Sequence, residues 1–222
     1  MIPYIDISPK VSERLSVYPG DVPYSRDIAL DFKNGDHLVL SSIRTTVHVG
    51  AHTDAPNHYS KDGVGIDQRD LSYYMGPCLV LDARRTPQGL RVRREFFNEK
   101  WKNTPTWPVP RILVRTDSFL ERENWRTDYC SLDPVLIDEW ARAGVRLVGI
   151  DTPSIDPDDS KDLPSHAMVA RHDMAILEGV DLSQVEEGLY TLIALPLRLE
   201  DADASPVRAI LLKDVEPLKL RA

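Results

Sequence analysis

Three of the six histidines in this sequence fall within a single stretch of eleven residues. A glycine and a proline interrupt that stretch, so we expect an extended chain there and not a helix. Side chains at even separations share one face of an extended chain, which predicts that His48, His52 and Asp54 point the same way. Two imidazoles and a carboxylate converging on one small volume are typical ligands of Zn²⁺, Mn²⁺ or Fe²⁺. The stretch therefore predicts a metal site.

The interrupting residues also set the direction of the backbone. Gly50 allows the chain to bend and bring the ligands together, and Pro56 turns it so that His58 approaches from another direction. The alternative is a polar strand whose imidazoles only make hydrogen bonds. The number of histidines and their spacing favour the metal site.

Further ligands must come from distant parts of the chain. His37 follows an Asn-Gly-Asp turn and is expected to be solvated, whereas His166 and His172 are both candidates. One continuous helix would hold His166 about 18 Å from Glu178, too far for a shared site. A helix, a turn near Asp173 and a strand ending at Glu178 would bring the two together. The sequence leaves the choice between His166 and His172 open.

Two other segments carry polar or aromatic side chains that a site could use. Asp151 and Asp156 follow an apolar run, where sites at sheet edges are often built, but the neighbouring prolines favour plain turn and capping roles. Tyr18 precedes a Pro-Gly pair that favours a tight turn. Its ring could pack against a planar ligand, although an aromatic side chain more often covers the core.

The elements that must position these residues are mainly short strands. Apolar runs predict strands at 2–7, 38–47, 78–81, 111–114 and 145–150. An antiparallel hairpin is predicted from 189–199 and 207–213, joined by a turn-rich connector at 201–206. Strands outnumber helices, which indicates a strand-rich, mixed α/β domain.

Two helices are predicted. Asp133 is a suitable N-cap, Pro134 suits the first helical position and Gly144 follows the end. Between them, Leu136, Trp140 and Ala143 recur at helical spacing. A second, shorter helix is expected over 165–171.

Composition narrows the class of protein. The 222 residues show no linker or repeat, so residues 1–222 are expected to form one domain. The net charge of −8 argues against a nucleic-acid partner. We expect no signal peptide and no membrane span, because no apolar run reaches roughly 18 residues. Cys78 and Cys130 form no Cys-x-x-Cys pair and are expected to be thiols in a reducing cytoplasm.

The pattern His48-x-x-x-His52-x-Asp54-x-Pro56-x-His58 resembles the metal motif of the cyclase-like metal-dependent hydrolases. The likeness extends over nearly the whole chain, through segments 18–21, 148–156, 165–166, 171–174, 176–178 and 192–208. The last of these segments is similar to the bacterial-type kynurenine formamidase (arylformamidase) branch of the family.

This resemblance implies a compact swivelling β/β/α fold, a homodimer and a binuclear metal site, usually zinc and with manganese as a possibility. It assigns metal-ligand positions to five residues: His48, His52, Asp54, His166 and Glu178. Asp54 and Glu178 would bridge the two ions. His58 matches the proton carrier. Tyr18 matches an aromatic residue that contacts substrate, where Trp or Phe is the expected type.

The implied reaction is hydrolysis of N-formyl-L-kynurenine to L-kynurenine and formate in tryptophan degradation. A hydroxide activated by the metal ions would attack the formyl carbonyl. His58 would protonate the departing aniline nitrogen. The alternatives are a related hydrolase of another aryl formamide or of a cyclic amide such as isatin, and a metal-stabilised binding protein without turnover.

Overall fold

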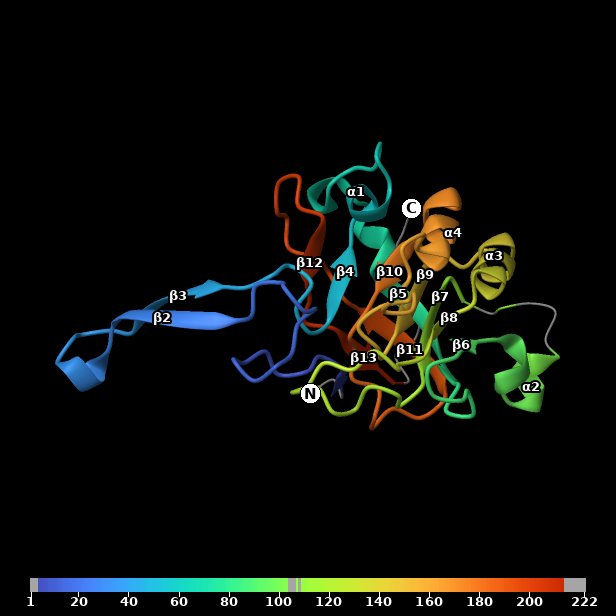
Figure 1. Ribbon diagram of the computed structural model, residues 1–222, viewed down its shortest axis with the longest axis horizontal. Coiled ribbons are helices and arrows are strands. Elements are labelled where there is room, and N and C mark those ends of the chain that lie inside the picture. The colour runs from blue at the N-terminus through green and yellow to red at the C-terminus, as the bar shows by residue number, and fades with distance from the viewer. Residues whose placement is uncertain (1–3, 104–106, 108, 214–222) are drawn as a thin grey trace.

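A computed structural model describes residues 4–103, 107 and 109–213 of the chain and has a seven-stranded mixed sheet at its centre (Figure 1). The strands lie in the order β1-β13-β11-β5-β7-β9-β10. Neighbours from β5 to β10 are parallel, and the remaining pairs are antiparallel. Their bounds are β1 Tyr4–Asp6, β5 Met75–Asp82, β7 Arg111–Arg115, β9 Leu147–Ile150, β10 Ala175–Leu177, β11 Gly188–Ile193 and β13 Ile210–Leu212.

Alternation along the strands divides the core between the two faces of the sheet. Leu79 and Leu81 of β5 belong to one buried cluster, and Cys78 and Val80 to the other. The first cluster also contains Trp140, from a helix that packs on that face. The helices there are α3 (Pro134–Arg142) and α4 (Pro164–Arg171) (Figure 1).

A second, smaller β layer carries part of the predicted metal motif. It pairs β4 (His52–Asp54) with β12 (Ala204–Pro206) in antiparallel register and leads into the short helix α1 (Pro56–Tyr59). Ala51 and Ala55, which flank β4, are buried in the cluster opposite α3. The expected β/β/α layering of a compact α/β domain is therefore confirmed.

A two-stranded arm projects from this body (Figure 1). It pairs β2 (Ser25–Leu30) with β3 (Leu40–Arg44) in antiparallel register. The remaining elements are β6 (Arg91–Val92) paired with β8 (Ser131–Leu132), α2 (Glu99–Lys102) and four 3₁₀ turns, Phe32–Asn34, Ile66–Gln68, Leu71–Tyr73 and Arg94–Phe96.

Most of the predicted elements are present. The Asp133 side chain accepts a hydrogen bond from the Val135 N–H at the start of α3, and Gly144 follows the helix with φ +93°. The buried residues of α3 are Leu136, Ile137 and Trp140. Ala143, which was expected to continue this pattern, lies at the C-cap and is exposed. The predicted helix over 165–171 is α4. The hairpin is confirmed by the antiparallel pairing of β11 with β13.

Three expectations about strands needed correction. The connector at 201–206 is more than a turn, because it contains β12. The predicted strand at 38–47 is ordered as β3 only between Leu40 and Arg44, and its partner β2 had no expected counterpart. The first strand of the predicted hairpin, expected over 189–199, ends at Ile193. The predicted N-terminal strand is present as β1 (Tyr4–Asp6), and residues 2 and 3 lie outside the described part of the chain.

Two compositional expectations can also be compared with the structure. Cys78 and Cys130 are both buried and free, in agreement with the prediction. Within the described residues, no helix has both the length and the apolar character needed to cross a membrane.

Candidate metal centre

The predicted ligands from the two halves of the chain meet where β4 passes the end of β10. The His52 N–H donates to the Glu178 carbonyl at 3.1 Å, and the Glu178 N–H donates to the His52 carbonyl at 2.9 Å. Two glycines permit this approach, since a Cβ on Gly179 would lie 2.1 Å from the Gly50 carbonyl oxygen. Both have positive φ, +61° at Gly50 and +66° at Gly179.

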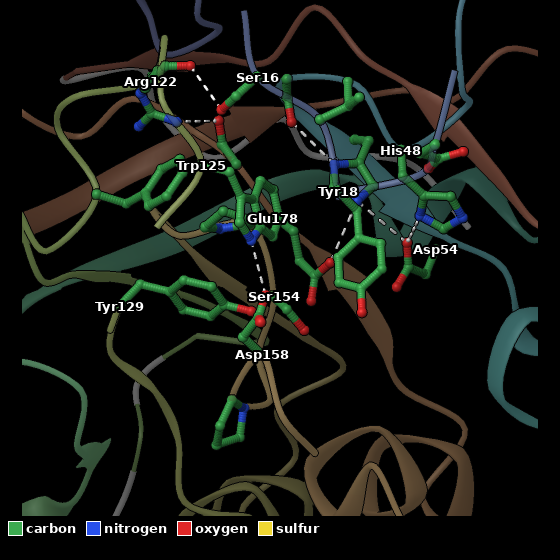
Figure 2. Close-up of a pocket in the computed structure, with 18 of the residues that line it drawn as sticks. Ser16, Tyr18, His48, Asp54, Arg122, Trp125, Tyr129, Ser154, Asp158 and Glu178 are labelled. Atoms are coloured by element: carbon green, nitrogen blue, oxygen red, sulfur yellow. Dashed lines mark hydrogen bonds and ion pairs between the residues drawn. The ribbon is translucent and has the colours of Figure 1, made fainter. Parts of the chain in front are cut away.

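Asp54 lies at the centre of the cluster, and imidazole nitrogens surround it. Its Oδ1 is 3.1 Å from His48 Nδ1 and 3.5 Å from His52 Nε2, and its Oδ2 is 3.4 Å from His166 Nε2. Glu178 faces the same nitrogens, with Oε2 at 3.3 Å from His52 Nε2 and Oε1 at 3.7 Å from His166 Nε2. Figure 2 shows His48, Asp54 and Glu178 on the wall of a shared pocket.

The structure brings together all five residues assigned as ligands and distinguishes the candidate histidines. His166, at the start of α4, enters the cluster. His172, at the other end of that helix, is 2.8 Å from Asp138 on α3. His37 is exposed near the turn of the arm.

One predicted reason for the convergence was wrong. His52 and Asp54 do share a face of β4. His48 lies outside the strands of the described residues and reaches Asp54 across the bend at Gly50, the second of the two predicted reasons.

Each of the three histidines predicted to be ligands uses its two ring nitrogens differently. One nitrogen faces the carboxylates of Asp54 or Glu178, and the other contacts a separate oxygen. These second contacts are His52 Nδ1 to the Gly50 carbonyl at 3.0 Å, His166 Nδ1 to Asp156 at 2.8 Å and His48 Nε2 to Asp203 at 2.9 Å. Outer acceptors of this kind fix the tautomer and orientation of metal-binding histidines.

The carboxylate of Asp54 fits a metal ion and lacks the partners of a structural carboxylate. It is 1% exposed, and neither of its oxygens has a hydrogen-bond partner among the described residues. Burial acts to raise the pKa of Asp54, but the imidazoles of His166, His48 and His52 hold it well below its ordinary value. A buried, ionised carboxylate needs a compensating charge, which a divalent cation can supply.

The neighbouring imidazoles respond to the same negative charge. Burial acts to lower the pKa of His48, but Asp54 and Asp203 raise it to about 9. Burial likewise opposes a charge on His166, but Asp156 and Asp54 raise its pKa to about 10. Protons on these rings and a metal ion would therefore compete for the same nitrogens.

A cavity of about 310 Å³ opens in front of this cluster. Four aromatic side chains also line this cavity and are called the aromatic wall: Tyr18, Phe119, Trp125 and Tyr129. Figure 2 shows Tyr18, Trp125 and Tyr129 among them. The Tyr18 and Trp125 rings meet edge to face at 5.5 Å. Tyr18 stands beside the predicted turn, in which the Asp21 N–H donates to the Tyr18 carbonyl at 2.9 Å. His58 also lines the cavity, with about a third of its side chain exposed.

The comparisons with known proteins agree with this architecture. The family model of putative cyclases matches residues 5–157, more than half of the chain. The chain belongs to the cyclase family. It is 43% identical over 206 residues to a kynurenine formamidase of Bordetella petrii, which covers 93% of this chain and 96% of that protein.

Solved structures share the cyclase fold at lower identity. A potential metal-dependent hydrolase with cyclase activity matches with a TM-score of 0.77 and 23% identity, over 96% of this chain and 100% of that one. An isatin hydrolase bound to the product analogue thioisatinate matches with a TM-score of 0.80 and 18% identity, over 96% of this chain and 92% of that one.

The two outer carboxylates of this cyclase-family site, Asp156 and Asp203, were not predicted to contact the histidines, although Asp156 had been weighed as a site residue. Asp156 does cap α4, accepting from the Ser165 and His166 N–H groups, as its turn chemistry predicted. It also holds the imidazole of His166. Burial acts to raise the pKa of Asp156, but His166 lowers it to about 2. Asp203 lay in the connector interpreted as a turn.

The rest of the aromatic wall was also missed. Phe119, Trp125 and Tyr129 lie in a polar loop, where recurring aromatics were the only available signal. Arg122 comes from the same loop, but its guanidinium is already used in hydrogen bonds. It donates to the carbonyls of Gly179, Asp151 and Val180.

Proposed function

We propose that this protein hydrolyses the formamide bond of N-formyl-L-kynurenine, releasing L-kynurenine and formate. The observation that carries the proposal is one cavity lined by the Asp54 cluster, the aromatic wall and His58. The 43% identity to a kynurenine formamidase, over nearly the full length of both chains, supports the same substrate.

We propose that two divalent ions bind, most simply zinc and alternatively manganese. His48, His52 and Asp54 place ligand atoms within 4.8 Å of one another, and so do Asp54, His166 and Glu178. Asp54 belongs to both groups, which supports a bridging role. When bound, such ions supply an activated water and polarise the carbonyl oxygen of the substrate.

His58 is proposed to move the proton. The C–N bond of the formamide breaks as the new C–O bond forms, and an anilide anion is a poor leaving group. The nitrogen must therefore gain a proton as it departs. His58 lies in α1 and lines the cavity without facing Asp54 or Glu178, so its imidazole remains available to the substrate.

The aromatic wall is proposed to bind the aryl ring of the substrate. Aromatic rings favour edge-to-face and offset contacts with one another. The edge-to-face arrangement already present between Tyr18 and Trp125 would extend to a third ring. Other aryl formamides and cyclic aryl amides such as isatin present a similar ring, so they belong in the test.

The test is an absorbance assay of the metal-loaded enzyme on three substrates: N-formylkynurenine, formanilide and isatin. We expect the highest kcat/KM on N-formylkynurenine, with activity lost on chelation and restored by zinc or manganese. Preference for isatin would identify the ring-opening hydrolase instead. Stabilisation by metal with no hydrolysis of any amide would indicate a binding protein.

We also propose that two copies of the chain, each a single domain of residues 1–222, associate through the arm. Ile28 and Ile43 are 50% and 64% exposed. The pairing of Arg26 with Ile43 and of Ile28 with Ser41 places both isoleucines on one face. An isolated two-stranded ribbon with such a face is marginally stable in water, and a second copy would cover it.

Light scattering of two variants tests this association. Ile43→Asp should shift the protein from dimer to monomer, because the charge would lie on the covered face. Ser42→Asp, which points to the opposite face, should leave the dimer intact. A monomeric wild-type protein would contradict the proposal.

The buried thiols Cys78 and Cys130 are consistent with the cytoplasm, which we propose as the location of the enzyme.

A further inference from the structure

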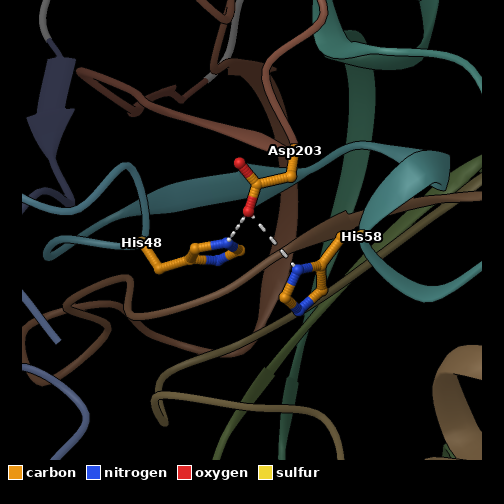
Figure 3. A group of neighbouring side chains, drawn as sticks. All are labelled: His48, His58 and Asp203. Atoms are coloured by element: carbon orange, nitrogen blue, oxygen red, sulfur yellow. Dashed lines mark hydrogen bonds and ion pairs between the residues drawn. The ribbon is translucent and has the colours of Figure 1, made fainter. Parts of the chain in front are cut away.

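Asp203 contacts two histidines with different proposed roles. Its Oδ2 is 2.9 Å from Nε2 of the metal-site residue His48 and 3.6 Å from Nδ1 of His58 (Figure 3). We propose that Asp203 is a positioning residue, which orients His58 for proton transfer and ties its position to His48. This inference rests on the proposed function and adds to it a residue that acts through His58.

The backbone around Asp203 is tied to the strand that carries the ligands. Asp203 directly precedes β12, whose Ala204 is the register partner of Asp54. The Ala55 N–H donates to the Asp203 carbonyl at 2.8 Å, and α1, which carries His58, begins at the next residue. The carboxylate and the imidazole that it faces are therefore held by one short stretch of paired backbone.

Two more contacts pin the loop that leads to Asp203. The Asn57 side-chain amide donates to the Asp201 carbonyl at 3.1 Å, and the Ile66 N–H donates to the Ala202 carbonyl at 2.9 Å. Asn57 is the residue directly before His58. The backbone segments that carry Asp203 and His58 are thus held side by side.

The contact selects one tautomer of His58. A carboxylate beside Nδ1 favours a proton on that nitrogen, which leaves the lone pair on Nε2 to exchange a proton with the substrate. At 3.6 Å the contact is longer than a hydrogen bond. Catalytic hydrogen bonds are often long before substrate binds and shorten in the complex.

The neighbouring ring extends this control. The His48 and His58 rings lie 4.4 Å apart between centroids, and Asp203 Oδ2 accepts from the His48 nitrogen that faces away from Asp54. A shift of His48 would therefore change the position of His58 through both the ring contact and the shared Asp203 oxygen.

The same three side chains do not suit a further cation. Their donor atoms lie within 4.8 Å of one another. However, in the proposed metal site an ion would bind His48 through Nδ1, the nitrogen that faces Asp54, so Nε2 would carry the proton that Asp203 accepts. A protonated nitrogen is not a ligand. Half of the Asp203 side chain is exposed, in contrast to the buried carboxylate of Asp54.

The test compares Asp203→Ala and Asp203→Asn with the control Glu200→Gln, which removes one charge from an exposed position in the same loop. All are assayed at saturating metal on N-formylkynurenine, with metal content measured. We expect Asp203→Ala to lower kcat about 10- to 100-fold with KM nearly unchanged. This loss is smaller than the full contribution of general acid–base catalysis to the rate, because His58 itself remains. Asp203→Asn, which keeps an acceptor oxygen, should retain more activity. Two ions per chain should remain bound, and Glu200→Gln should behave as wild type.

A second comparison distinguishes positioning from a general structural role. In a His58→Ala background, adding Asp203→Ala should change kcat less than about threefold, because the residue through which Asp203 acts is already gone. An equal loss in both backgrounds would overturn the inference. So would an Asp203→Ala enzyme with wild-type kcat.

The inference can also be tested without turnover. Nitrogen-15 NMR of the zinc-loaded protein should show the Nδ1–H tautomer of His58 in the wild type and a mixture of tautomers in Asp203→Ala. Identical His58 spectra in the two proteins would overturn the positioning role. If the wild type hydrolyses no formamide while these spectra differ, the proposed function fails and the contact stands.

Discussion

Asp54 and Asp151 are both buried aspartates, but their surroundings differ. Asp151 is 3% exposed and accepts three hydrogen bonds, from the Thr116 N–H, the Thr116 hydroxyl and the Asp117 N–H, at 2.6 to 2.8 Å. Asp54 is similarly buried but has only imidazole nitrogens around it at 3.1 to 3.5 Å. A buried carboxylate with all its partners supports the fold, whereas one without them is suited to bind a cation.

The largest effect is expected at Asp54. Asp54→Asn should abolish binding of both ions, because it removes the one carboxylate shared by the two ligand groups. Activity should fall by more than the roughly 100-fold that loss of an outer partner causes. Elemental analysis and circular dichroism of the purified variant check this. A folded variant that keeps two ions would contradict the role of Asp54 as a metal ligand.

A smaller effect is expected at Asp156, which contacts His166 but does not line the cavity. Asp156→Asn should weaken metal binding about 10- to 100-fold, since His166 loses its charged acceptor. Competition with a chromophoric chelator measures this change. Asp138→Asn is the matched control, because it breaks the other Asp–histidine contact, at His172, away from the centre. Equal affinity in the two variants would contradict an outer-partner role for Asp156.

Asp151 should affect stability and leave metal binding unchanged. Asp151→Ala leaves buried N–H groups of Thr116 and Asp117 without an acceptor and should lower the free energy of unfolding by about 1–3 kcal/mol. Urea unfolding measures the loss, and elemental analysis should find the wild-type metal content. Loss of metal with unchanged stability would reverse the contrast with Asp54.

The pH dependence offers the finest comparison. Burial raises the pKa of Asp151, and this outweighs the hydrogen bonds from Thr116 and Asp117. The folded chain therefore holds this proton more tightly than the unfolded chain. The resulting stabilisation is complete below pH 3.8 and is lost as the pH rises through the folded-state pKa. The stability difference between wild type and Asp151→Ala should accordingly shrink as the pH rises above about 4.

Asp138 supplies the opposite sign. The hydrogen bond from His172 lowers the pKa of Asp138, so its contribution is present above pH 3.8 and is lost as the pH falls. The advantage of wild type over Asp138→Asn should therefore decline towards acid pH, as measured by urea unfolding at several pH values. Parallel trends for the two positions would show that burial does not set the pKa of Asp151.

How far the sequence predicted the site depended on the distance between its parts along the chain. The metal motif was recognisable because its residues are neighbours, and the strand alternation correctly placed His52 with Asp54. The same alternation does not apply to His48, which lies before the bend at Gly50 that the sequence also predicted. The capping pattern at Asp133 predicted α3 for a similar reason, because a helix start depends on adjacent residues.

The sequence by itself determined the type of chemistry, because the histidines and the carboxylate of the metal motif are close along the chain. Their proximity does not depend on how distant segments pack. Only the tertiary structure decided which distant groups join the motif. His166 was selected over His172 because α4 points its first turn at β4, and Asp203 was delivered by the pairing of β12 with β4. Contacts between residues some 150 positions apart depend on strand order and register, and these follow from the packing of the whole chain.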